Sequence, residues 1–135
     1  MELPIKASCQ CGQLSYQLKA APIKVVACHC QECQKLSTSA YSVTAIVKAE
    51  DIEFQGKLNE WQRIADSGNK NIAKFCGQCD NRIYHYNPDD TATIKLKPVG
   101  RQYSAMFEPE IHLWLSEKQN WVQIPKHIQC FDKQP

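Results

Sequence analysis

The sequence predicts a mainly β protein made of antiparallel sheets with few short helical turns. Three features of the chain support this prediction. Short apolar or alternating runs of strand length recur throughout, clusters of turn-forming residues separate them, and a helical pattern stands out only over residues 31–36. Regular short strands of this kind favour antiparallel pairing between neighbours.

The predicted strands follow one another at short intervals. In chain order they cover residues 14–18, 25–27, 41–47, 52–54, 61–65, 72–75, 83–86, 93–96 and 111–115. Turn signals occur at residues 67–69, 87–90 and 98–100, and residues 105–110 are expected to form a loop or a short turn. The Ser-Gly-Asn signal at residues 67–69 is expected to close a hairpin whose second strand leads to Cys76.

Length and composition indicate one domain spanning residues 1–135. The net charge is only +2 and no run of lysine or arginine occurs, which argues against a nucleic-acid-binding surface. No apolar stretch resembles a signal peptide or approaches the roughly 18 residues of a membrane span. We therefore expect no membrane segment and a cytoplasmic location, where thiols stay reduced.

The eight cysteines are the strongest functional signal. An even number also suits a disulfide framework, but the missing secretion signal and the tight spacings favour shared metal ions. Cys9-x-Cys11 and Cys76-x-x-Cys79 each supply two soft ligands from a tight turn, and together they complete the tetrahedral shell of a zinc ion. We therefore predict a structural zinc bound by these four thiolates.

The central motif, Cys28-His29-Cys30-x-x-Cys33, supplies three more thiolates. In an extended segment Cys28 and Cys30 point to one face and His29 to the other, and a turn brings Cys33 to the same centre. A zinc with three protein ligands keeps a position open for water or substrate, which is typical of catalytic sites. The alternative is a closed structural site completed by a remote ligand, for which the candidates are His85, His112, His127 and Cys130.

Other groupings of the cysteines are conceivable. Cys9 and Cys11 can be combined with two of the central three, but each such scheme strands an incomplete pair. The division into four and three leaves only Cys130, which we interpret as an ordinary thiol.

The three cysteine groups resemble the glutathione-dependent formaldehyde-activating enzyme family, whose domain also occurs in centromere protein V. The motifs that carry the resemblance are Cys9-x-Cys11-Gly12, Cys28-His29-Cys30-x-x-Cys33 and Phe75-Cys76-x-x-Cys79, and it extends over roughly residues 7–121. The resemblance implies a β-tent arrangement of antiparallel sheets around a structural zinc held by Cys9, Cys11, Cys76 and Cys79. It also implies a second, labile zinc, associated with activity, on Cys28, Cys30 and Cys33.

Three positions depart from the family pattern. Asp80 stands where members usually carry glycine after the last cysteine, Lys74 replaces a common arginine, and Gln34 stands where a basic residue is common. Aspartate tolerates a left-handed backbone, so zinc binding remains expected with Asp80. The changes at Lys74 and Gln34 bear on substrate preference instead.

The resemblance implies a carbon–sulfur lyase-type enzyme, similar to S-(hydroxymethyl)glutathione synthase, that joins a thiol such as glutathione to formaldehyde or a related aldehyde. Three thiolate ligands weaken the Lewis acidity of a zinc ion, so we expect the ion to hold the thiol rather than polarise the carbonyl. The alternatives are a non-catalytic zinc-scaffolded binding module, or an enzyme of the same fold acting on another thiol or aldehyde. Candidate cations for an anionic thiol are Lys24, Lys35, Lys74 and Arg101.

Overall fold

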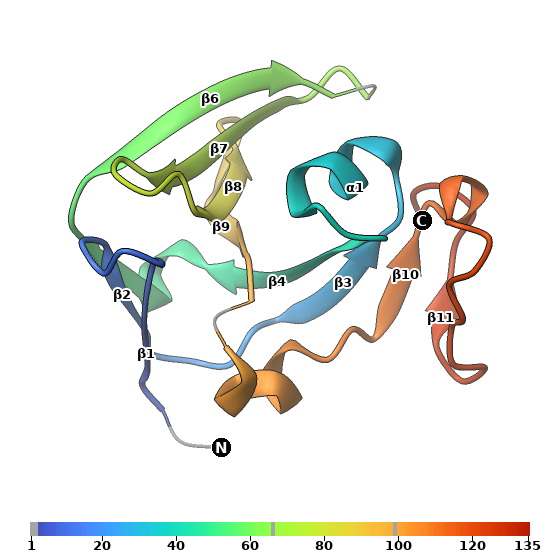
Figure 1. Ribbon diagram of the computed structural model, residues 1–135, viewed down its shortest axis with the longest axis horizontal. Coiled ribbons are helices and arrows are strands. Elements are labelled where there is room, and N and C mark those ends of the chain that lie inside the picture. Colours follow the sequence, from blue (N-terminus) through green and yellow to red (C-terminus); the bar gives the residue numbers. More distant parts are fainter. Residues whose placement is uncertain (1–2, 66, 99) are drawn as a thin grey trace.

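The computed structural model describes residues 3–65, 67–98 and 100–135 and is mainly β (Figure 1). Its strands are β1 (Ile5–Ser8), β2 (Ser15–Leu18), β3 (Lys24–Cys28), β4 (Ser42–Lys48), β5 (Ile52–Gln55), β6 (Leu58–Ile64), β7 (Lys70–Cys76), β8 (Arg82–Asn87), β9 (Asp90–Leu96), β10 (Ile111–Leu113) and β11 (Gln129–Cys130). Its helices are α1 (Gln31–Ser37) and the short 3-10 helices η1 (Ala49–Asp51), η2 (Arg101–Phe107) and η3 (Leu115–Glu117). No helix within the described ranges is long and apolar enough to span a membrane.

The strands form two sheets. The smaller sheet has the order β1-β2-β5 and the larger has the order β11-β10-β3-β4-β9-β8-β7-β6. Pairing is antiparallel as predicted except at β10, which runs parallel to both β3 and β11. The chain reaches β10 from β9 through η2, and this long connection lets β10 lie beside β3 in the same direction.

The local predictions agree closely with these elements. The hairpin of β6 and β7 is closed at residues 67–69, where the Ala65 N–H donates to the Asn69 carbonyl at 2.8 Å. The helical turn predicted over residues 31–36 is α1, and residues 105–107 of the predicted loop belong to η2. The alternation predicted for residues 111–115 ends early, because Trp114 has a positive φ of 60° and Leu115 begins η3. Strands β1 and β11 were not predicted.

The core lies between the two sheets. Leu14 and Leu18 from the small-sheet side pack in the same buried cluster as Val47 and Leu96 from the large sheet. Each of these side chains is at most 1% exposed, and burying one of this size contributes roughly 1.5–3 kcal/mol. This shared core holds the β1–β2 loop against the end of β7, which positions the first cysteine group.

Gly56 makes a close backbone contact with the loop that follows β1. Its φ is +119°, and a Cβ atom there would lie 2.5 Å from the Gln13 carbonyl oxygen. We expect Gly56→Ala to lower the free energy of unfolding by about 2–5 kcal/mol, from backbone strain and overpacking together. Urea unfolding measures this change.

Gly68→Ala is the matched control. Gly68 also has a positive φ, +87°, but a Cβ atom there would meet no other atom within 4 Å. Only the strain of about 1–2 kcal/mol should remain in that variant. Equal losses in both variants would contradict the role assigned to the Gly56 contact.

Candidate metal centres and their pocket

Four cysteine sulfurs converge between the two sheets. Cys9 and Cys11 come from the β1–β2 loop, whereas Cys76 ends β7 and Cys79 lies in the turn before β8. The Sγ of Cys9 lies 3.6 Å from that of Cys11 and 3.5 Å from that of Cys76, and Cys11 to Cys76 is 3.7 Å. A tetrahedral zinc with bonds of about 2.3 Å separates its sulfur ligands by about 3.8 Å. The four free thiols therefore fit a zinc ion in both number and spacing.

Two residues with a positive φ let the backbone turn tightly around this group. Gly12 has a φ of +84°, and the Gly12 N–H donates to the Cys9 carbonyl at 3.2 Å. Asp80 has a φ of 63°, and the Asp80 N–H donates to the Cys76 carbonyl at 3.1 Å. The left-handed conformation considered for Asp80 from the sequence is therefore confirmed, and aspartate replaces glycine there without opening the turn.

Hydrogen bonds to sulfur stabilise the anionic form of Cys76. Burial raises the pKa of Cys76, but the N–H of Cys79, the Gln13 side chain and the N–H of Gln78 outweigh it and bring the pKa to about 6. The Nε2 of Gln13 donates to the Cys76 Sγ at 3.0 Å and to the Lys57 carbonyl at 2.8 Å. Gln13 thus orients the Cys76 sulfur while tying the β1–β2 loop to the chain before β6.

Gln13→Ala should weaken metal binding at the four-cysteine group. Removing an outer hydrogen bond to a ligand typically costs 10–100-fold in metal affinity, and we expect a loss in that range. Competition with a chromophoric chelator measures it. Gln10→Ala is the control, because the Gln10 side chain is exposed and only its backbone N–H is engaged, with Asn81 Oδ1 at 3.1 Å. Equal affinities in both variants would contradict the role of Gln13.

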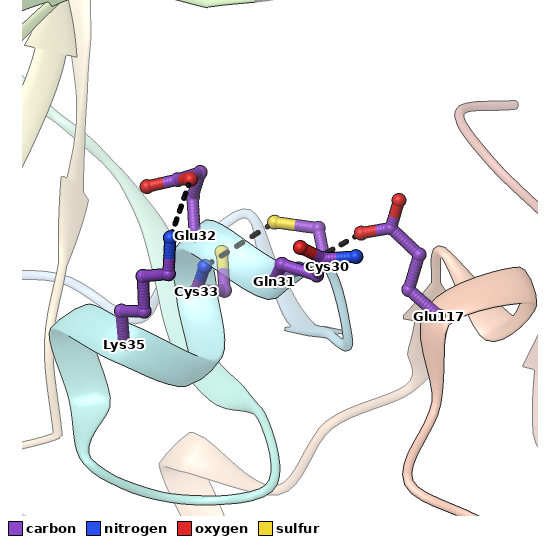
Figure 2. A network of polar contacts seen from close by, with 6 residues as sticks. All are labelled: Cys30, Gln31, Glu32, Cys33, Lys35 and Glu117. Atoms are coloured by element: carbon purple, nitrogen blue, oxygen red, sulfur yellow. Dashed lines mark hydrogen bonds and ion pairs between the residues drawn. The ribbon is translucent and has the colours of Figure 1, made fainter.

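The second group, Cys28, Cys30 and Cys33, lies where β3 meets α1. Cys28 ends β3, Cys30 is the N-cap residue of α1, and Cys33 lies in its first turn. The Sγ of Cys30 accepts a hydrogen bond from the Cys33 N–H at 3.3 Å (Figure 2). The three sulfurs lie within 4.8 Å of one another, so the start of the helix gathers them around one centre.

No histidine or further cysteine completes the three-cysteine group within the described part of the chain. His29 points away from it, as predicted, and its Nε2 lies 2.8 Å from the Nδ1 of the buried His112. The Nδ1 of His29 has no partner among the described residues, so a proton on Nε2 avoids leaving a buried N–H unsatisfied. Burial, then the charges of His112 and Lys118, lowers the pKa of His29 to about 4. His29 therefore belongs to the packing behind the group.

A half-buried lysine supplies counter-charge to the three thiols. Lys97 follows β9, and its Nζ donates to the Thr44 Oγ1 at 3.1 Å. Burial lowers the pKa of Lys97 to about 8, against the raising effect of Cys33. The pKa of Cys33 is lowered by hydrogen bonds from Cys28 and Cys30, and further by Ser42 and Lys97. Lys97 belongs to no sequence motif. Its one signal is its position directly after the strand predicted over residues 93–96.

The three-cysteine group opens into a pocket of about 680 Å³. One wall is the sheet face of β3, β4 and β9, and the hairpin of β6 and β7 forms another. Residues near the C-terminus, including Trp114 and Glu117, line the end near α1. A ligand in this pocket can approach all three thiols, whereas the four-cysteine group is not among the lining residues.

The cations proposed from the sequence do not all lie in the pocket. Lys24 lines the pocket, whereas Lys35 pairs with Glu32 at 3.3 Å and Lys74 pairs with Glu60 at 3.1 Å. The side chain of Arg101 lies outside the described residues. The pocket cations that sequence reasoning missed are Arg63, Lys70 and Lys95, because only strand register brings them to this cavity.

The Gln34 side chain makes three hydrogen bonds. Its Nε2 donates to the His29 carbonyl at 2.7 Å and to the Glu117 carbonyl at 2.9 Å, and its Oε1 accepts from Gln119 at 2.8 Å. These bonds tie α1 to the segment after β10. Gln34 therefore positions the three-cysteine group and does not line the pocket.

Comparisons with known proteins agree with this arrangement. The family described as glutathione-dependent formaldehyde-activating enzyme matches residues 4–117. A Rhodobacter sphaeroides protein, whose crystal structure was determined as a structural genomics target, is similar in fold with a TM-score of 0.57 and 16% sequence identity. The alignment covers 78% of this chain and 97% of that chain. No protein with a curated function matches the sequence.

Proposed function

Because the chain belongs to the glutathione-dependent formaldehyde-activating enzyme family, we propose that it is a zinc-dependent carbon–sulfur lyase-type enzyme. Its reaction joins a thiol such as glutathione to formaldehyde or a related aldehyde. The observation that carries the proposal is the three-cysteine group in the wall of a pocket of about 680 Å³. A separate four-cysteine group between the sheets leaves the pocket group free for chemistry.

The two groups have different roles in this proposal. Cys9, Cys11, Cys76 and Cys79 hold a structural zinc, and Cys28, Cys30 and Cys33 hold a second zinc with an open position. A zinc bound at the second group would lower the pKa of a substrate thiol and favour its thiolate. Lys97 and Ser42 stabilise negative charge on the ligand sulfurs, and Gln34 fixes the start of α1.

The reaction balances without a further reactant. The thiol loses its proton, its sulfur forms a bond to the carbonyl carbon, and the carbonyl π electrons move to oxygen, which takes up a proton. The sum is a thiol and formaldehyde giving an S-hydroxymethyl adduct. We also infer a cytoplasmic location, because the eight cysteines are free thiols and thiols stay reduced there.

An NMR exchange measurement with glutathione and formaldehyde tests the reaction. We expect interconversion of the free thiol and the adduct to be faster with the zinc-loaded protein than without it. A rate equal to the uncatalysed background would overturn the named reaction. The same assay with other thiols and aldehydes then tests whether the fold serves a different substrate.

Metal content separates the enzyme from a non-catalytic scaffold. We expect two zinc ions per chain, one of which is perturbed when glutathione is added. Cobalt substitution makes this visible, because thiolate-to-cobalt absorption changes when a thiol enters the coordination shell. A single inert zinc would favour the scaffold.

A further inference from the structure

The pocket beside the three-cysteine group carries more positive than negative charge. Four cations line it, namely Lys24, Arg63, Lys70 and Lys95. Its lining carboxylate side chains are Glu32 and Glu117, and both are engaged near the start of α1 (Figure 2). Glu32 pairs with Lys35 at 3.3 Å, and Glu117 accepts from the Gln31 N–H at 2.8 Å. Among the described residues, neither side chain forms a salt bridge with a pocket cation.

Among the residues that the structure describes, none of the four cations forms a salt bridge. Arg63 and Lys95 are half-buried, whereas Lys24 and Lys70 are exposed. Unpaired charges held partly out of solvent are favourable places for an anion, because the attraction is less screened there. Arg63 and Lys95 are therefore the stronger binding groups.

Sheet register places the cations in one region. Lys24 pairs with Ile46, Ile46 pairs with Lys95, and Lys95 pairs with His85, so these residues form one row across four strands. Arg63 pairs with Asn71 on the facing hairpin, and both line the same pocket. The pKa of His85 reflects the positive charge around it. Withdrawal from solvent, and then the charges of Lys97, Lys95, Arg82 and Arg63, hold this pKa well below the usual range.

The distance from this row to the thiols suits a short peptide. Lys24 and Cys28 lie on the same strand face four residues apart, a separation of about 13 Å at strand rise. A three-residue peptide spans about 10 Å when extended. Part of that span and the length of a lysine side chain together bridge the separation, so a thiol at the cysteine group leaves a carboxylate within reach of the Lys24 end of the row. Lys95 lies two strands further along the same row.

We propose that Lys95 and Arg63 bind the carboxylate groups of the thiol substrate, so that the enzyme selects anionic thiols over neutral ones. The two side chains come from different strands that line the pocket, and a thiol with two carboxylates can contact both. This inference rests on the proposed function, because it assigns the residues that recognise the thiol. Lys24 and Lys70 raise the local concentration of such anions at the pocket entrance.

Kinetics with two thiols test the assignment. The variants Lys95→Gln and Arg63→Gln are compared with wild type in the adduct assay, using glutathione and the uncharged 2-mercaptoethanol. We expect each substitution to lower the ratio of kcat/KM for glutathione to that for 2-mercaptoethanol by about tenfold, through KM. Lys95→Arg keeps the charge and should restore most of the ratio. Lys6→Gln, which removes an exposed charge from β1, is the matched control and should leave the ratio unchanged.

Calorimetry with S-methylglutathione separates this inference from the proposed reaction. The thioether keeps both carboxylates but cannot form a thiolate, so its affinity reports the anion site alone. We expect S-methylglutathione to bind Lys95→Gln and Arg63→Gln more weakly than wild type. We also expect it to bind wild type more weakly in about 0.5 M salt than in about 0.05 M salt, because salt screens the attraction between the charges. Equal losses for both thiols, or no change in S-methylglutathione affinity, would overturn the assignment. Absence of adduct formation with intact S-methylglutathione binding would instead overturn the proposed reaction alone.

Discussion

We expect the Cys76→Ser variant to be unfolded. Cys76 is fully buried, and its sulfur lies 3.5 Å from that of Cys9 on the other side of the sheet interface. A structural zinc of this kind contributes about 10–16 kcal/mol of apparent binding free energy, comparable with the 5–15 kcal/mol or so that stabilises a whole domain. We expect one zinc ion fewer per chain by elemental analysis and no cooperative unfolding transition by circular dichroism.

Two further variants separate loss of metal from loss of packing. Cys11 is exposed, so Cys11→Ser removes a ligand without placing a hydroxyl in the core, and it should also be strongly destabilised. Cys130→Ser is the control, because Cys130 is exposed and belongs to neither group. Retention of the zinc by Cys76→Ser, or a melting temperature within about 4 °C of wild type, would show that the four-cysteine group is not a structural metal site.

Cys28→Ser should abolish activity while the protein stays folded. Cys28 is half-buried at the end of β3 and lines the pocket, and the four-cysteine group lies elsewhere, between the sheets. Loss of one of the three proposed ligands should release the second zinc. We expect adduct formation to fall at least about 100-fold, equivalent to about 2.7 kcal/mol of transition-state stabilisation. Metal content should fall from two ions per chain to one.

The stability of Cys28→Ser provides the internal check on this result. Its melting temperature should stay within a few degrees of wild type, roughly the effect of a 1 kcal/mol change in a domain of this size. Cys130→Ser serves again as the control and should retain full activity. Wild-type activity in folded Cys28→Ser would remove the three-cysteine group from the reaction, even if the four-cysteine group were confirmed.

The strand predictions were accurate where short apolar or alternating runs supply side chains to a buried face. Val25 and Ala27 in β3, and Ile94 and Leu96 in β9, are buried as the pattern requires. Strand β1 was missed although Ile5 and Ala7 alternate with Lys6 and Ser8, because four residues give only a short pattern, and its strand conformation comes from pairing with β2. The predicted extension to Leu115 failed because Trp114 turns the chain into η3, whose N–H groups bond to the C-terminal segment.

Both cysteine groups followed from spacing. Ligands separated by one or two residues are held together by the local turn, so Cys9 with Cys11, and Cys76 with Cys79, had to act as pairs. Counting ligands then joined these pairs and left the central three together, which agrees with the two groups in the structure. The remote completion considered for the central group, by histidine or Cys130, is absent from the described residues.

By itself the sequence determined the strand content, the two cysteine groups and the family, because each depends on residues close together in the chain. Only the tertiary structure decided which side chains surround the open group. Lys97 reaches Thr44 across 53 positions of sequence, and Arg63 and Lys95 meet the same cavity from different strands. The register of paired strands and the closure of the β6–β7 hairpin set these distances, and no local pattern encodes them.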